Sequence, residues 1–95
     1  MPASVYPQVN ITTPNSSQIF SKDNPIGFGG AFSPKDCVIT ISFQSTVVTV
    51  TKNNNMWSAN LQPPTGGWLL GVFDAIVTAS YGGYGQQASI NLRVY

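Results

Sequence analysis

The sequence predicts an all-β domain, folded as a sandwich of two antiparallel sheets with about seven strands in Greek-key order. Three observations lead to this prediction. Apolar and polar residues alternate in several short runs, as expected for strands that bury one face. Residues that favour turns separate these runs at intervals of about ten residues, as in two-sheet sandwiches. Helix signals are nearly absent, because Glu is missing and no window repeats apolar positions at helical spacing.

The first half of the chain contains short strands. Residues Val9–Thr12 and Gln18–Phe20 predict two short opening strands, and alternate positions from Ile26 to Phe32 predict a third. The clearest run is Cys37–Phe43, in which Cys37 and every second residue after it should face the core. Thr46–Thr51 is β-branched throughout and alternates weakly, as an edge or second-layer strand does.

The second half contains three further runs. In Trp57–Leu61 the two end residues and Ala59 share one face. In Phe73–Tyr81 the odd-numbered residues should face inward, and in Ala88–Val94 the even-numbered ones. The residues expected to lie at the centre of the core are Ile39, Ile41, Trp57, Val77, Ile90 and Leu92.

The chain length sets the number of domains. Ninety-five residues are enough for one modest core. Residues 1–8 are expected to be a linker or disordered lead-in, and residues 9–95 a single domain. Nothing in this segment reads as a signal peptide, so an export signal would lie elsewhere in a larger chain. The longest apolar stretch, Trp68–Ala79, is interrupted by Asp74 and is too short to cross a bilayer, so membrane insertion is not expected.

The composition excludes several classes of function. Charged residues make up 7 % of the chain, against roughly 25 % in an average soluble protein. A net charge of +1 from four scattered cations gives no basic surface, so nucleic-acid binding is not expected. With no His and one Cys, the chain can build neither a zinc site nor an internal disulfide.

Several motifs, taken in order, resemble a known family. The opening stretches Val9–Pro14 and Pro25–Pro34 are similar to a hydrophobic strand, a Thr-Ser-Pro type of turn and a glycine-rich strand. Asn55–Leu61 resembles a Gly-x-Trp-Ser-Ala-x-Leu strand, and Thr65–Gly67 with Phe73–Ser80 is similar to the strand that follows it. In this order and spacing, the motifs resemble bacterial immunoglobulin-like (Ig-like) repeat modules over about residues 9–94.

This resemblance implies an Ig-like sandwich and a non-catalytic role. Such modules serve as stalks, adhesins, enzyme accessories and phage-tail parts. The implied function is a rigid spacer or protein-contact domain of an extracellular or cell-surface protein, with other domains, subunits or neighbouring repeats as partners. Many members bind calcium between repeats through Asp residues. The corresponding loop here, Ser80–Gly85, contains no acid, so we expect no calcium, other metal or cofactor.

No residues form a convincing catalytic group. General acid–base and nucleophilic catalysis both need a positioned partner, and Cys37 has no His to activate it. We expect Cys37 to fill the core. Asp74 should point outward, and Lys22 with Asp23 should form an exposed pair. The sequence therefore predicts that the chain is not an enzyme.

The candidate contact surface lies in the loops. Trp68, Leu69 and Leu70 follow a Pro- and Gly-rich loop, and three large apolar residues there predict either an end cap of the sandwich or a contact surface. Tyr81 and Tyr84 flank a Gly-Gly turn, where tyrosines are good contact residues. Three alternatives stay open: hairpin packing for the tyrosines, a carbohydrate-binding accessory domain that uses these loop aromatics, and an enzyme-inhibitor loop.

Overall fold

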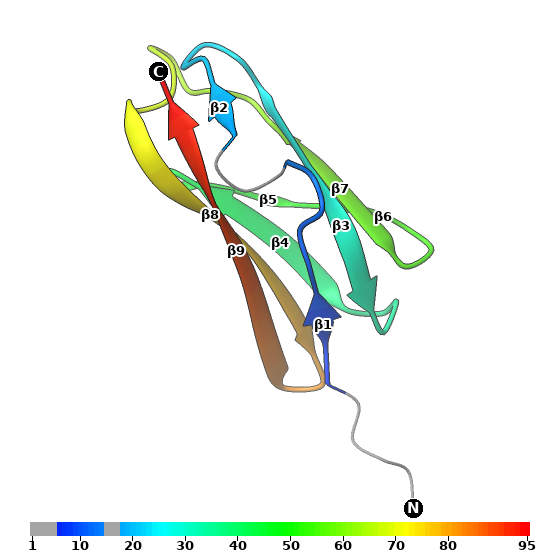
Figure 1. Ribbon diagram of the computed structural model, residues 1–95. Helices are drawn as coiled ribbons and strands as arrows, with labels where there is room; N and C mark the ends of the chain where they lie inside the picture. The colour runs from blue at the N-terminus through cyan, green and yellow to red at the C-terminus, as the bar shows by residue number, and fades with distance from the viewer. Residues whose placement is uncertain (1–5, 15–17) are drawn as a thin grey trace, which may run out of the picture.

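The chain forms two β-sheets that face each other in the computed structural model (Figure 1). This structure describes residues 6–14 and 18–95, and none of these is helical. In spatial order, one sheet contains β1 (Gln8–Val9), β3 (Ile26–Ser33), β7 (Met56–Leu61) and β6 (Thr51–Asn53). The other contains β2 (Ile19–Phe20), β9 (Tyr84–Val94), β8 (Gly71–Tyr81), β4 (Val38–Phe43) and β5 (Thr46–Thr49). The predicted all-β sandwich is confirmed, and in the described ranges no helix is long and apolar enough to span a membrane.

The described residues form nine strands rather than about seven. β1 and β2 overlap the two expected opening strands, but have only two residues each. An unexpected strand arises because the run Thr46–Thr51 divides at Val50, which is buried where the chain passes from the five-stranded to the four-stranded sheet. The connections β3–β4, β5–β6 and β7–β8 all change sheets, as in a Greek-key sandwich. One pairing departs from the expected antiparallel order, because β2 runs parallel to β9.

The N-terminal segment is partly described. Residues 1–5 of the expected lead-in lie outside the described residues. Pro7 is buried, and β1 begins at Gln8, where it pairs with Ser33 of β3. After β1 the chain keeps bonding to β3, because the backbone N–H groups of Asn10 and Thr12 donate to carbonyl groups of that strand.

The core forms where the two sheets turn their apolar residues toward each other. Of the six residues expected at its centre, five are buried, with at most 2 % of their surface exposed. Ile90 is only half-buried. It lies on β9, which has only the two-residue β2 beyond it in the order of the sheet, so this side of the core has less cover.

Trp57 is held in the core by a contact that needs a glycine. Trp57 lies directly opposite Gly30 in the β3–β7 pair, and its Nε1–H donates to the carbonyl oxygen of Asn10 at 2.9 Å. A Cβ at position 30 would lie 2.0 Å from this oxygen and 2.7 Å from Trp57 Nε1. Two hydrogen bonds in turn fix Asn10 to Ala31. The backbone N–H of Asn10 donates to the carbonyl oxygen of Ala31, and the N–H of Ala31 donates to the side-chain Oδ1 of Asn10. Because Gly30 has no side chain, the backbone at Asn10, just after β1, can pass close to the indole of Trp57.

The domain is elongated, with extents of 52 × 20 × 20 Å. β8 and β9 have eleven residues each and run along the long axis (Figure 1). Their hairpin lies at the same end as the start of β1, while the C-terminus and the loop before β8 lie at the other end. We call these the N-terminal end and the C-terminal end of the domain.

Replacing Gly30 should destabilise the fold far more than replacing another glycine of the same strand. We expect Gly30→Ala to lower the free energy of unfolding by about 3 kcal/mol, at the upper end for overpacked sites, because the new methyl group would meet backbone. Gly27→Ala is the matched control, because a Cβ there would meet nothing within 4 Å. Urea denaturation of the two variants tests this, and equal losses of stability would contradict it.

Candidate contact surface

The five residues predicted as a contact surface do not form one surface. Leu69 and Leu70 lie at the C-terminal end, just before β8 begins. Tyr81 and Tyr84 lie at the N-terminal end, at the hairpin that joins β8 to β9. Eleven residues of extended chain separate the two groups, roughly 35 Å at the usual rise of a strand.

Trp68 is not a surface residue. Only 2 % of its surface is exposed, and its ring packs edge-on against Phe43 with 5.1 Å between ring centroids. Its backbone N–H donates to the carbonyl oxygen of Lys22 at 2.8 Å, and its Nε1–H donates to that of Asn24 at 2.8 Å. Of the two alternatives left open by the sequence, Trp68 is therefore the end cap.

A glutamine side chain fixes the backbone next to Trp68. Gln44 Oε1 accepts from the N–H of Leu69 at 2.6 Å, and Gln44 Nε2 donates to the carbonyl oxygen of Leu69 at 3.0 Å. Gln44 and Ser45 both have positive φ angles, 48° and 70°, in the turn between β4 and β5. Left-handed backbone costs about 1–2 kcal/mol per non-glycine residue, so the two bonds to Leu69 help to offset that cost.

The side chains that follow Trp68 point outward and extend an apolar cluster. Leu69 and Leu70 are 65 % and 63 % exposed. The outer face of the five-stranded sheet adjoins them. There Arg93 of β9 lies between Ile19 of β2 and Val72 of β8, and it pairs in register with both. A small hollow of about 100 Å³ opens beside Val72 and Arg93. We define the C-terminal apolar cluster as the exposed residues Ile19, Leu69, Leu70, Val72 and Tyr95.

The hairpin tyrosines offer less surface. The turn between them has positive φ at both central residues, Gly82 and Gly83, which is the backbone of a tight two-residue hairpin loop. Tyr81 is half-buried and packs against the core, while Tyr84 is 44 % exposed. The ring of Tyr84 stacks edge-on against Tyr6 with 4.6 Å between centroids. With Trp68 buried, the loop aromatics do not form the shared platform that sugar stacking would use.

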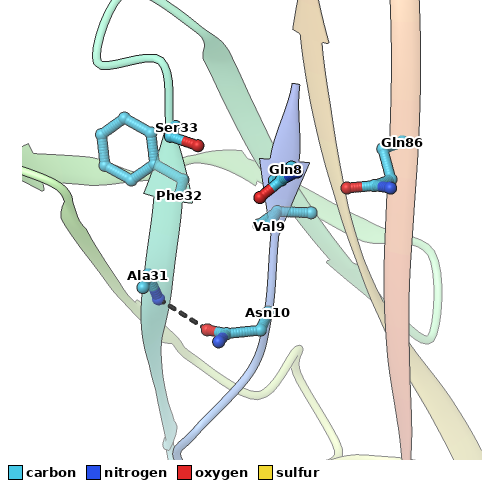
Figure 2. Close-up of a pocket in the computed structure, with 7 residues that line it drawn as sticks. All are labelled: Gln8, Val9, Asn10, Ala31, Phe32, Ser33 and Gln86. Carbon is cyan, nitrogen blue, oxygen red and sulfur yellow. Dashed lines mark hydrogen bonds between the residues drawn. The ribbon is translucent and has the colours of Figure 1, made fainter. Parts of the chain in front are cut away.

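A polar groove lies between β1, β3 and β9 near the N-terminal end (Figure 2). Its volume is about 360 Å³, and its lining contains the side-chain amides of Gln8 and Gln86 but no charged group. Figure 2 shows Gln86 pointing from β9 toward β1, while the amide of Asn10 is already bonded to Ala31. Nothing in the sequence marked these residues, because Gln and Asn occur throughout the chain.

In the part of the chain that the structure describes, the ionisable side chains do not gather into a catalytic group. Asp74 is exposed and accepts a hydrogen bond from Asn91, and Lys22 forms an exposed ion pair with Asp23 at 3.3 Å. Cys37 is fully buried, and this burial raises the pKa of its thiol. Among residues 6–14 and 18–95, no three His, Cys, Asp or Glu side chains lie where they could share a metal ion.

Comparison with known proteins identifies the fold. An endo-β-1,4-mannanase from Thermotoga petrophila superposes with a TM-score of 0.78 at 10 % identity, over 96 % of this chain but only 20 % of the mannanase chain. Fibronectin(III)-like modules of Clostridium thermocellum CbhA match with a TM-score of 0.68 at 15 % identity, over 92 % of this chain and 94 % of theirs. Titin domain M7 matches with a TM-score of 0.68 at 13 % identity, over 100 % of this chain and 99 % of the titin domain. Neither a protein-family model nor a curated protein sequence matches the chain.

These similarities concern the fold alone. The chain has the Ig/fibronectin(III)-like sandwich found as one module in longer proteins, and it spans about one fifth of the mannanase chain. At these identities the neighbours identify neither a ligand nor an activity, because unrelated functions share this fold. The resemblance to bacterial Ig-like repeats is therefore supported as to fold, and membership of that family stays a prediction.

The end-cap role of Trp68 predicts a large difference between neighbouring positions. Trp68→Ala should lower the free energy of unfolding by about 3–5 kcal/mol, because it removes a buried indole. Leu69→Ala should change it by no more than about 0.5 kcal/mol, because that side chain lies in solvent. Thermal and urea denaturation would measure both, and a stable, folded Trp68→Ala protein would contradict the end-cap assignment.

Burial of Cys37 predicts a loss of stability at alkaline pH. The pKa of the folded thiol lies above its ordinary value of 9.0, so above about pH 9 the unfolded chain loses this proton while the folded chain keeps it. The contribution of Cys37 to stability is therefore complete below pH 9 and declines as the pH rises. Urea denaturation at neutral and alkaline pH should show a steeper decline for the wild type than for Cys37→Ala, and equal slopes would contradict the prediction.

Proposed function

We propose that this chain is a non-catalytic structural module of a larger extracellular protein of a bacterium or phage. In this proposal it acts as a rigid spacer and contacts a neighbouring domain or subunit through its C-terminal apolar cluster. The observation that carries the proposal is the arrangement of an elongated sandwich with the start of β1 and the C-terminus at opposite ends of the long axis (Figure 1). The Ig/fibronectin(III)-like neighbours, which occur as modules of longer chains, support a structural role.

The pairing of β2 with β9 suits a module that carries tension. The two strands are parallel and lie at the C-terminal end, so pulling the chain ends apart would slide one strand along the other. Beyond the ladder itself, backbone hydrogen bonds from Arg93 N–H to Gln18, Tyr95 N–H to Phe20 and Lys22 N–H to Tyr95 join the two segments. These bonds lie across the pulling direction, so a pulling force would load all of them at the same time. Strands loaded in this way separate at a higher force than strands whose bonds break one after another.

The C-terminal apolar cluster is the candidate contact with a neighbour. Its five large side chains are between 54 % and 67 % exposed, and the loop that carries two of them, Leu69 and Leu70, is held by the hydrogen bonds of Trp68 and Gln44. A fixed loop loses little conformational entropy when a partner covers it, so burial of the cluster would contribute directly to association. The low charge of the chain, 7 %, also means that such contacts would depend little on salt.

Single-molecule pulling between the two chain ends tests the spacer function. We expect one abrupt unfolding event that lengthens the chain by roughly 250 Å, at about 3.5 Å per released residue. Arg93→Pro should lower the unfolding force, because it removes the N–H that bonds to Gln18. Arg93→Ala keeps that N–H and is the matched control. Gradual extension without a distinct event, or equal forces for both variants, would contradict the proposal.

A further inference from the structure

The four strands at the ends of the two sheets are not protected equally. Exposed edges invite pairing with other chains, and proteins block them with short strands, prolines or lysines. β1 and β2 have two residues each, Pro7 precedes β1 and Lys22 lies just beyond β2. β6 has three residues, with Lys52 at its centre. β5 has four residues, Thr46–Thr49, and contains neither a charge nor a proline.

The hydrogen-bond pattern shows which groups of β5 face away from the sheet. The N–H of Val50 donates to the carbonyl oxygen of Ile39, so these two residues form a bonded pair of the β4–β5 ladder. Bonded pairs alternate along antiparallel strands, so the next one joins Ile41 and Val48. The N–H and C=O groups of Val47 and Thr49 therefore point away from β4. No backbone group within the described part of the chain bonds to them.

We propose that β5 pairs antiparallel with β5 of a second copy of this chain around a twofold axis. With Val48 opposite its own counterpart, Val47 of each copy lies opposite Thr49 of the other. Each of these two residue pairs exchanges two hydrogen bonds, so all four outward N–H groups meet outward carbonyl groups. A register centred on Val47 would bring Ser45 into the pairing, and the φ angle of 70° there takes the chain out of the extended conformation.

A second copy fits this edge because the edge is complementary to itself. The twofold arrangement places every outward donor opposite an acceptor, and Val47 and Thr49 share the outer face of the sheet. β4 and β5 contain no charged residue, so two copies do not repel each other there. Val47 is 63 % exposed and Val38, on the same face of β4, is 58 % exposed. Pairing would cover part of this apolar surface.

The size of the contact predicts a weak, closed dimer. Four residues from each copy form less than a standard interface, so association should need high protein concentration or many copies held close together. The other end strands are shorter, and each contains a lysine or lies close to a lysine or proline, so growth should stop at two copies. In the dimer, the five-stranded sheets of the two copies would form one continuous sheet, with the long axes of the two domains in opposite directions. This contact lies along the side of the domain, so it does not depend on the spacer function.

Sedimentation and amide hydrogen exchange test the pairing on the intact chain. Between about 10 µM and about 1 mM, we expect a shift from monomer to dimer but no larger species. Over the same range, exchange of the Val47 and Thr49 amides should slow by at least about tenfold. The Val48 and Val50 amides bond to β4 and should be protected at every concentration. A monomer at about 1 mM, open-ended aggregates or unchanged Val47 exchange would overturn the proposal.

Two edge variants and one control separate pairing from folding. Val47→Pro removes an N–H that faces the second copy but none from the ladder with β4, so the dimer should be lost while the fold persists. Val48→Pro removes a ladder bond and should lower the melting temperature. If Val47→Pro fails to fold, Val47→Lys keeps the backbone intact and places like charges at the edge. A dimer that survives in folded Val47→Lys protein would contradict the pairing.

Discussion

The indole of Trp57 lying over Gly30 is the contact on which the rest of the fold depends. Burying an indole removes about 200 Å² from water, worth at most about 5 kcal/mol. An unpaired indole N–H in the core would cost about 1–3 kcal/mol of this. The carbonyl oxygen of Asn10 prevents that loss, but it reaches the indole only because residue 30 has no side chain. Asn10, which this contact holds next to β3, is also one of the residues that line the polar groove.

Trp68 repeats this arrangement at the C-terminal end. Both indole N–H groups donate to backbone carbonyl oxygens of the segment that precedes β3, at Asn10 and Asn24. The two tryptophans therefore hold one stretch of chain at two places along the long axis. These residues and Cys37 are buried, whereas the C-terminal apolar cluster and the exposed side chain of Val47 on β5 lie on the surface. The proposed contacts of this chain therefore use surface side chains that take no part in the core.

Period-two alternation predicted the parts of the fold that depend on one strand at a time. The core face of Cys37–Phe43 and the burial of Trp57 follow from local pattern, and both are confirmed. Trp68 could not be assigned in this way, because its burial depends on carbonyl groups of Lys22 and Asn24, more than forty positions away in the sequence. The division of Thr46–Thr51 into two strands was also not predictable, because an unbroken β-branched run gives no sign of a crossing at Val50.

Hydrogen exchange of the two indole N–H groups, followed by NMR, tests most directly whether the tryptophans hold the fold together. If both are bonded inside the core, they should exchange only when the whole domain unfolds, with the same free energy as the most protected backbone amides of β4 and β8. Rapid exchange of Trp57, at the rate of a solvent-exposed indole while those amides remain protected, would show that its contact with Asn10 is not what secures the sandwich.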